Sequence, residues 1–270
     1  MKKLSARRRH PLAALVVLLF ALAATGGLYA AFAPAGEAKA AQSSSKSLAI
    51  EEGKKLYDVG CSSCHGKGGQ GTSDGPSLVG VGSAAVDFQV GTGRMPAQQP
   101  GAQIPSKPKS YSQKEIDQLA AYIASLGGGP AIPTKDQYSP AGADIAHGGE
   151  LFRTNCAQCH NFTGRGGALT HGKYAPSLSD VSPKHMYEAM ATGPQNMPSF
   201  PDTVVTQKDK KDIIAYLKTV NSDDSVSPGG FDLGGLGPVP EGLFAWVAGL
   251  GAMVAIAVWV AARTAKAKKS

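Results

Sequence analysis

The sequence has only four cysteines among its 270 residues, and none of them stands alone. They form two copies of a Cys-x-x-Cys-His pattern, at residues 61–65 and 156–160. A zinc ribbon is excluded because its cysteine pairs lie ~15–20 residues apart, whereas 91 residues separate Cys64 from Cys156. A thioredoxin-like redox pair would need a βαβ pattern, which is not recognisable here. Disulfide pairing in an exported chain would not explain a histidine directly after both pairs.

Cys-x-x-Cys-His is the attachment motif of a c-type haem. Two thiols one helical turn apart can form thioethers with the vinyl groups on one edge of the porphyrin, and the adjacent histidine can then ligate the iron. The sequence therefore predicts two covalently bound haem c groups. The expected attachment residues are Cys61, Cys64, Cys156 and Cys159, and the expected proximal iron ligands are His65 and His160.

The distal ligand of the first haem follows from what is missing after the first motif. Between His65 and His147 there is no other histidine and a single methionine, Met95. A lone methionine often fills a hydrophobic core, but Met95 stands in a glycine-containing irregular stretch directly before Pro96. Since His/Met ligation of haem iron is a known arrangement that raises the reduction potential, Met95 is the predicted distal ligand.

The second motif belongs to an internal repeat of the first, with a period of 95 residues. Four positions before Cys156 match those before Cys61: Ile145, Gly148, Leu151 and Phe152 correspond to Ile50, Gly53, Leu56 and Tyr57. Downstream, Met197-Pro198 repeats Met95-Pro96. Elimination does not identify the distal ligand of the second haem, because four other candidate ligands also follow His160: His171, His185, Met186 and Met190. The repeat selects Met197 as the second distal ligand.

Apolar periodicity predicts a closing helix in each copy, at Tyr111–Leu126 and at Thr206–Val220. Ser112 with Glu115 forms a capping-box pattern at the start of the first of these helices. Charged residues are nearly balanced in both copies and are expected on solvated faces, as are His147, His171 and His185. A domain of about 80 residues has a marginal core, which the haem would complete.

Charge is absent from two long stretches near the ends of the chain. Residues 11–36 follow five basic residues and indicate an export signal, either cleaved after Ala38-Lys39-Ala40 or, as we favour from its length, retained as an anchor. Residues 242–262 are 21 uncharged residues, about 31 Å as a helix at ~1.5 Å per residue, and predict a transmembrane helix with Trp246 and Trp259 near its ends.

The basic excess lies in the two tails. The net charge is +7, but nine basic residues lie in 1–10 and 263–270, which leaves 18 basic against 20 acidic residues between them. This distribution argues against nucleic-acid binding. Because Lys and Arg favour the cytoplasmic side, both tails are expected on the cytoplasmic side of the cell membrane. The haem domains are then expected on its extracytoplasmic side.

Two Cys-x-x-Cys-His segments, each followed by Met-Pro, resemble tandem class I cytochrome c domains. In such domains a proline at the position of Pro76 or Pro176 offers its carbonyl to the proximal histidine Nδ1–H, and the resemblance implies this orienting role for both prolines. The expected fold is all-α, with the two domains, a C-terminal transmembrane helix and an N-terminal hydrophobic signal or anchor helix. The expected division is 1–45 signal or anchor and linker (with a Ser-rich linker at 42–47), 46–130 first domain, 140–222 second domain, 223–241 Gly/Pro-rich non-helical spacer, 242–262 transmembrane helix and 263–270 cytoplasmic tail.

The spacer sequence Gly229-Gly230-Phe231…Gly237-Pro238-Val239-Pro240-Glu241-Gly242 before the C-terminal anchor is similar to that of the dihaem cytochrome c subunit of actinobacterial cytochrome bc1 complexes. This resemblance implies cytochrome b and Rieske iron–sulfur subunits as partners, together with membrane lipid. It also implies electron flow from menaquinol through the Rieske cluster and the two haems to an aa3-type oxidase, within a quinol–cytochrome c reductase.

Two alternatives stay open at this point. One is a dihaem c subunit of another membrane oxidase, such as the cbb3 type, or of a dehydrogenase, although such oxidase subunits usually lack a C-terminal anchor. The other is a dihaem peroxidase, which would need an open iron site that two Met-Pro motifs do not obviously leave. No acid–base or nucleophilic catalytic set is recognisable, so the expected chemistry is that of the cofactor.

Replacing Cys61 and Cys64 together by alanine should impair folding of the first domain, because the haem supplies its missing apolar centre. Circular dichroism on the purified double variant measures this as lost helix signal and a lower melting temperature. A native helical spectrum with an undiminished melting temperature would contradict the expectation.

Overall fold

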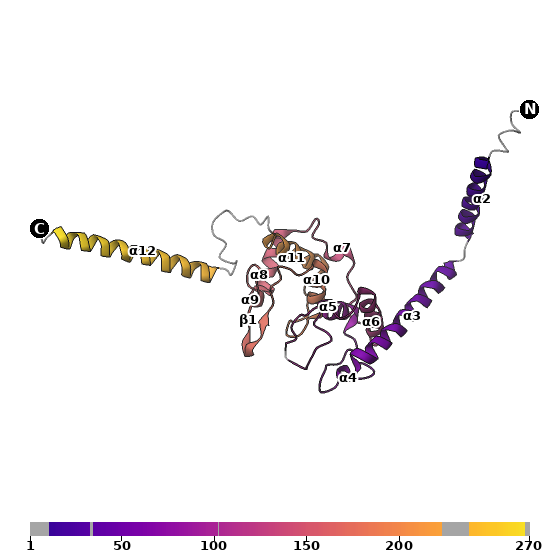
Figure 1. Ribbon diagram of the computed structural model, residues 1–270, viewed down its shortest axis with the longest axis horizontal. Coiled ribbons are helices and arrows are strands. Elements are labelled where there is room, and N and C mark those ends of the chain that lie inside the picture. Colours follow the sequence, from indigo (N-terminus) through magenta and orange to yellow (C-terminus); the bar gives the residue numbers. More distant parts are fainter. Residues whose placement is uncertain (1–10, 33–34, 102, 223–237, 268–270) are drawn as a thin grey trace, which may run out of the picture. The chain divides into compact units, whose positions relative to one another are not determined.

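The computed structural model describes residues 11–32, 35–101, 103–222 and 238–267 (Figure 1). Within these ranges the chain is mostly helical, and the strands are the two-residue β1 (Gly167–Ala168) and β2 (Tyr174–Ala175). The predicted all-α class is therefore confirmed. The chain divides after Glu51 into two units.

The first unit contains α2 (Pro11–Phe32) and the beginning of α3 (Ala35–Gly60). Residues Leu12–Ala31 of α2 are long and apolar enough to cross a membrane. The Ser-rich residues 42–47, expected as a linker, are instead helical within α3. The Ser47 hydroxyl donates to the Ser43 carbonyl at 3.0 Å, a bond within the helix that lets serine remain in it.

The second unit begins at Glu52 and contains both predicted domains. The first domain consists of the end of α3, α4 (Ser62–His65), α5 (Gly82–Gly91) and α6 (Gln113–Ser125). Its closing helix α6 begins where the sequence predicts, because Ser112 and Glu115 form the capping box in both directions. The predicted apolar stripe of α6 is buried at all four positions, Ile116, Leu119, Ala120 and Ile123.

The second domain repeats this arrangement with α8 (Ile145–Asn155), α9 (Ala157–His160), α10 (Pro183–Thr192) and α11 (Gln207–Val220). Thr206 and Asp209 form the capping box of α11. The short α7 (Lys135–Tyr138) between the domains packs on α10 and α11. The core consists of Phe152, Met186, Tyr187, Met190, Val205, Ile213, Ile214 and Leu217.

In each domain the helix before the cysteine motif crosses the closing helix at a glycine. A Cβ atom on Gly53 of α3 would lie 1.9 Å from the Gln118 carbonyl oxygen of α6, and one on Gly148 of α8 would lie 2.0 Å from that of Asp212 in α11. Only glycine allows two helix backbones to approach so closely. This requirement explains why glycine recurs at this position of the 95-residue repeat.

Several charged side chains lie inside the second domain rather than on the expected solvated face. Lys210 is 0 % exposed, and its ammonium donates to Asp202 Oδ1 at 2.6 Å and to the Val205 carbonyl at 2.8 Å. Asp212 is 1 % exposed and accepts from Lys208 Nζ at 2.7 Å and His147 Nδ1 at 3.1 Å. Their partners are the reason these charges tolerate burial.

The titration of Asp212 reflects this environment. Burial by itself would raise the pKa of the Asp212 carboxyl, but the hydrogen bonds from Lys208, His147 and the Asp144 N–H hold that pKa below its usual range. The His147 side chain is 40 % exposed, so it lies at the surface as expected, and it also hydrogen-bonds to the buried Asp212.

The C-terminal helix α12 (Pro238–Ala267) contains the predicted membrane span. Residues Glu241–Arg263 are long and apolar enough to cross a membrane. The helix begins at Pro238, so residues 238–241, expected in a non-helical spacer, are helical; proline is well suited to a first helical turn. The rest of that spacer, 223–237, lies outside the described residues. The Arg263 guanidinium stacks on the Trp259 ring at 4.3 Å.

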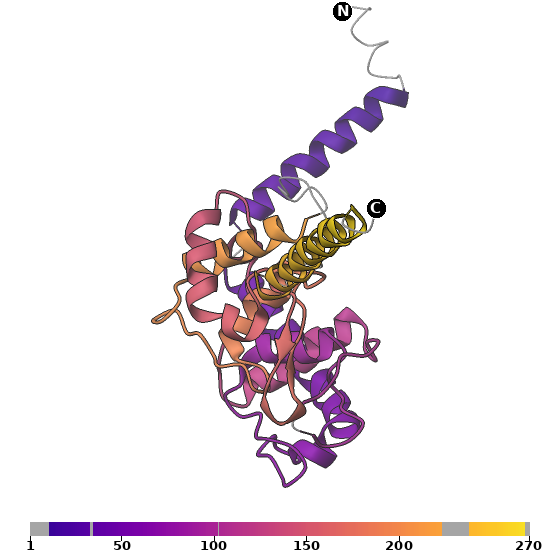
Figure 2. The same cartoon turned by 90° about the vertical axis from the view of Figure 1, so that its left-hand side faces the viewer.

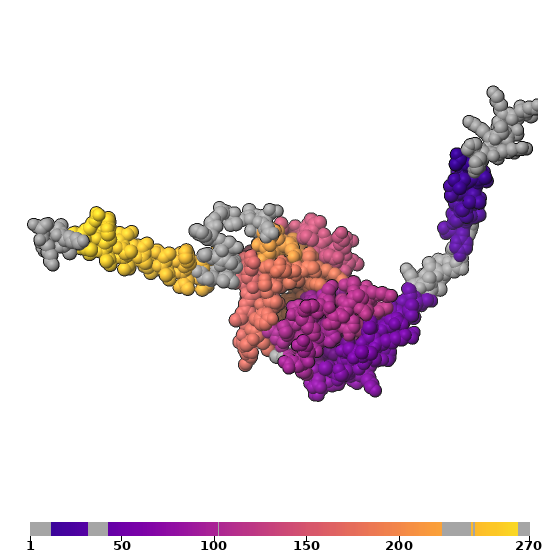
Figure 3. All heavy atoms as spheres, viewed as in Figure 1, coloured from indigo at the N-terminus to yellow at the C-terminus, as the bar shows by residue number. Residues whose placement is uncertain are grey.

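The two domains contact each other through α5 and α10, and their colours, violet to magenta and pink to orange, can be followed in Figure 2 and Figure 3. Side-chain amides reinforce the contact in both directions. Gln103 of the first domain bonds the backbone N–H and C=O of Tyr174, at 3.0 and 2.7 Å. Gln195 of the second domain accepts from the Ile104 backbone N–H at 3.1 Å and donates to the Ile104 carbonyl at 3.0 Å.

Gly148→Ala should destabilise the second domain by about 1–3 kcal/mol, the usual cost of overpacking, because the new methyl would overlap the Asp212 carbonyl. The measurement is thermal unfolding of the haem-loaded protein by circular dichroism. Gly149→Ala is the matched control, since its methyl would meet only side-chain atoms of Arg153 and Tyr216 at 3.1 Å. Equal melting temperatures for the two variants would show that the close helix crossing does not require glycine at position 148.

Candidate haem-binding sites

The two Cys-x-x-Cys-His motifs have the same local conformation. In each, the first cysteine ends the preceding helix, with Cys61 N–H donating to Tyr57 O and Cys156 N–H to Phe152 O, both at 2.9 Å. One short helical turn follows, α4 or α9, which ends on the histidine. The helical turn places the two sulfur-bearing residues three apart on one side, as attachment to one porphyrin edge requires.

Both motif histidines are oriented by a proline carbonyl. His65 Nδ1 lies 2.8 Å from the Pro76 oxygen, and His160 Nδ1 lies 3.2 Å from the Pro176 oxygen. A carbonyl can only accept, so Nδ1 carries the proton and the Nε2 lone pair is left for a metal. Burial lowers the pKa of His160 despite the opposing bond to Pro176, which favours the neutral, metal-binding form of the ring.

The loops that carry the two prolines start alike and then differ in length. Leu78 N–H donates to Gly69 O and Leu178 N–H to Gly164 O, each at 2.7 Å. The proline follows its histidine by 11 residues in the first domain and by 16 in the second. The additional residues form the β1–β2 hairpin, in which Gly167 pairs with Ala175. The hairpin was not predicted, and the longer spacing to Pro176 was the available signal.

Two further glycines shape these loops and were missed in the sequence. Gly71 and Gly166, again 95 residues apart, have φ of +85° and +83° and donate to the His65 and His160 carbonyls at 2.8 and 2.9 Å. A Cβ on Gly71 would lie 2.7 Å from Ser77 N, and one on Gly166 would lie 2.4 Å from Ala175 O. Their repeat at the motif's own period could have identified them.

The four motif cysteines are free thiols. Burial, aided by the second cysteine of each pair, raises the pKa of Cys61 and of Cys156 to about 11. Cysteines that act as redox or zinc-binding thiolates are characterised by a lowered pKa. This environment argues against a reactive thiolate at Cys61 and at Cys156.

The two candidate distal methionines lie in the loops that follow α5 and α10. Each of these helices ends on a threonine-to-carbonyl bond, Thr92 to Phe88 at 2.6 Å and Thr192 to Glu188 at 2.7 Å. Met95 is half-buried, and its N–H donates to Gln89 O at 2.9 Å. Met197 is half-buried against the core of the second domain.

A cavity of about 440 Å³ lies in the second domain beside the attachment motif. Its lining includes Cys159 of the motif, Leu169 and Thr170 of the hairpin region, and Asn196, the neighbour of Met197. The cavity thus brings the motif and the methionine loop to one place. Neither His160 nor Met197 lines this cavity, so the candidate haem c site is assigned from the cysteine motif and the oriented histidine.

Two charged or titratable residues near these sites, His185 and Arg94, pack against the Phe88 ring, which the sequence did not predict. His185, expected on the surface, is half-buried and packs edge-on against Phe88 at 6.1 Å. Arg94, next to Met95, stacks on the same Phe88 ring at 5.0 Å and donates to Thr92 Oγ1 at 2.6 Å. Burial lowers the pKa of Arg94.

Gly166→Ala should disturb the His160–Pro176 hydrogen bond and shift the reduction potential of one haem, because its methyl would overlap the hairpin backbone. The measurement is a spectroscopic redox titration of the purified protein. Gly172→Ala is the matched control: it has the same left-handed conformation, φ +71°, with nothing within 4 Å of its Cβ position, so it adds only the backbone cost of ~1–2 kcal/mol. Identical reduction potentials in both variants would contradict the role of Gly166 in holding Pro176 against His160.

Comparison with known proteins agrees with this arrangement. A family model described as cytochrome C oxidase, cbb3-type, subunit III matches twice, at residues 48–123 and 143–217, once around each motif. A cbb3-type cytochrome c oxidase subunit FixP from Bradyrhizobium diazoefficiens is 29 % identical over 143 residues, 49 % of this chain and 46 % of that protein. These matches show cytochrome c domains, which bind haem c and carry electrons.

Relatives that match along nearly the whole chain identify the subunit type. The cytochrome bc1 complex cytochrome c subunit of Mycobacterium tuberculosis (strain ATCC 25618 / H37Rv) is 47 % identical over 264 residues, 96 % of this chain and 93 % of that protein. That of Corynebacterium diphtheriae is 46 % identical over 282 residues, 97 % of this chain and 99 % of that protein. The chain therefore belongs to the family of cytochrome c subunits of the respiratory cytochrome bc1 complex.

Proposed function

We propose that the chain holds two covalent haem c groups and passes electrons from a Rieske iron–sulfur subunit of its bc1 complex to an aa3-type terminal oxidase. The observation that carries the proposal is the repeated geometry of the two motifs: the same helical turn, the same free thiols and the same proline carbonyl on the histidine Nδ1. Two sites built alike support two haems of one electron-transfer type.

The residues of this chain have separate roles in the proposal. The four motif cysteines attach the cofactor, and His65 and His160 ligate it through Nε2 with Nδ1 held by Pro76 and Pro176. Met95 and Met197 are the proposed distal ligands. When bound, haem c supplies a one-electron iron couple, and the protein sets its potential and position.

The contacts between the domains support an electron path between fixed sites. Gln195 lies two residues before Met197 and bonds the Ile104 backbone of the first domain, while Gln103 bonds Tyr174 at the hairpin. The two candidate sites thus belong to one connected body. We propose that the first domain receives electrons and the second delivers them, an order taken from the family.

The membrane arrangement follows from the two ends of the chain. Both α2 and α12 are long and apolar enough to span a bilayer, and basic residues flank their outer ends in the sequence. By the preference of Lys and Arg for the cytoplasmic side, the haem domains are proposed to face the extracytoplasmic side. There they would meet the Rieske and cytochrome b subunits of the complex.

Purification of the tagged full chain in mild detergent tests the proposed assembly. The expected result is co-purification of a b-type haem, seen in the reduced-minus-oxidised spectrum, together with an iron–sulfur subunit. Recovery of the chain with c-type haem alone would contradict membership of a quinol-oxidising complex.

Met197→Ala should lower the potential of one haem and slow electron delivery to the oxidase, because thioether ligation raises the potential. Each loss of about 59 mV lowers the equilibrium constant of a one-electron transfer about tenfold. The measurement is a redox titration followed by oxidase turnover with the purified complex. Met190→Leu, a volume-conserving change that removes the thioether of a buried core methionine, is the control. An unchanged two-step titration in Met197→Ala would show that Met197 is not a ligand.

A further inference from the structure

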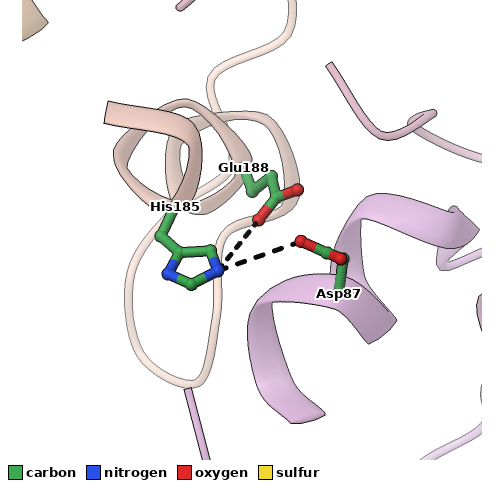
Figure 4. Close-up of side chains that lie close together, drawn as sticks. All are labelled: Asp87, His185 and Glu188. Carbon is green, nitrogen blue, oxygen red and sulfur yellow. Dashed lines mark ion pairs between the residues drawn. The ribbon is translucent and has the colours of Figure 1, made fainter. Parts of the chain in front are cut away.

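Three potential metal ligands from both domains meet where α5 packs on α10 (Figure 4). Asp87 comes from α5, and His185 and Glu188 come from successive turns of α10. His185 Nε2 lies 3.9 Å from Asp87 Oδ2 and 4.0 Å from Glu188 Oε2. One ligand atom from each residue lies within 4.8 Å of the others.

The two carboxylates of this cluster are buried, and one has no hydrogen bond. Asp87 is 2 % exposed and Glu188 is 0 % exposed. Neither carboxylate oxygen of Glu188 has a hydrogen-bond partner among the described residues, and Lys184 Nζ is 3.8 Å from Oε1. A buried carboxylate without a hydrogen bond is costly, and the Lys184 ammonium lies closer to Asp87 than to Glu188, so Glu188 is short of a cationic partner.

We propose that Asp87, His185 and Glu188 bind a single zinc ion that joins the two domains. One imidazole nitrogen with two carboxylate oxygens is a zinc donor set, whereas Mg²⁺ and Ca²⁺ prefer oxygen ligands alone. Tetrahedral zinc with bonds of about 2.0–2.1 Å separates its ligand atoms by roughly 3.3 Å. The observed 3.9 and 4.0 Å therefore need to contract by roughly 0.6–0.7 Å.

Lys184 is the resident cation that zinc would replace. Its ammonium lies 2.6 Å from Asp87 Oδ2, and its side chain is 28 % exposed, so it can turn toward solvent. The remaining charged groups around the cluster are Arg94 and Lys109, which act on His185, and Asp117, which acts on Lys184. With Lys184 withdrawn, two carboxylates match the charge of one zinc ion. A water molecule at the partly exposed side of His185 completes four ligands.

The zinc site would fix the contact between the domains at one point. Helix α5 leads into the Met95 loop and α10 into the Met197 loop, so the ion would set the position of both loops relative to each other. The packing of the His185 ring against Phe88 already orients its Nε2 toward the carboxylates. The inference does not depend on the proposed electron route, and its failure would leave that route intact.

A second group of similar composition serves as the contrast. His147, Asp209 and Asp212 also lie within ligand distance of one another. There Asp212 is already hydrogen-bonded to Lys208, His147 and the Asp144 N–H, so no buried carboxylate lacks a partner. We therefore expect no zinc at this group, and His147→Gln is a matched control.

The experiment uses the haem-loaded full chain in detergent, stripped with EDTA and dialysed against Zn²⁺. Elemental analysis should give one zinc per chain, and X-ray absorption at the zinc edge should show nitrogen and oxygen ligands at about 2.0–2.1 Å without sulfur. Glu188→Gln and His185→Gln should lose this zinc, and His147→Gln should retain it. Unchanged haem spectra and circular dichroism show that each variant is folded.

A second variant keeps the test decisive if the ligand variants fail to accumulate. Lys184→Met removes the competing ammonium and should bind zinc about tenfold more tightly or better, the lower end of the effect of changes around metal sites. If Lys184 only formed a structural ion pair with Asp87, the Lys184→Met protein would be less stable and would not bind zinc more tightly. Absence of stoichiometric zinc in the wild type, sulfur ligands, or equal zinc in Glu188→Gln and wild type would each overturn the proposal.

Discussion

The close crossing of two helix backbones in each domain is the constraint on which the haem sites depend. Gly53 and Gly148 let the helix before each motif lie directly on the closing helix. The first cysteine then ends that helix at a fixed point, so the following helical turn and its histidine are placed by the crossing. Since the crossing buries Tyr57 or Phe152 against the closing helix, the core of each domain and the position of its motif are set together.

From the crossing outward, each loop returns to the histidine by a glycine-dependent path. Gly71 and Gly166 adopt conformations that other residues rarely take, and the chain then presents Pro76 or Pro176 to the ring. The second domain reaches the same end with a longer loop and a hairpin. The orienting hydrogen bond is therefore kept while the chain length between its partners changes.

The interface between the domains adds what neither domain contains alone. Two glutamines bond backbone groups of the opposite domain, and Lys184 pairs with Asp87 across α5 and α10. The helices α5 and α10 are equivalent in the repeat, with Thr92 and Thr192 at their ends, and Glu188 of α10 corresponds to Phe88 of α5. Equivalent helices therefore meet with different side chains. The repeat thus supplies two similar domains, and its departures from symmetry create the polar cluster between them.

Local patterns by themselves determined the two closing helices, the cap at Ser112, the two motifs and the two membrane-length helices, because each depends on neighbours within a few residues. Tertiary structure alone decided which charges are buried. Asp87 and Lys184 are 97 residues apart, and Lys210 and Asp212 looked like solvated helix residues. A charge is stable inside only where partners meet it. For Asp87 and Asp212 these partners include Lys184 and His147, which lie far away in the sequence, so no local pattern records their meeting.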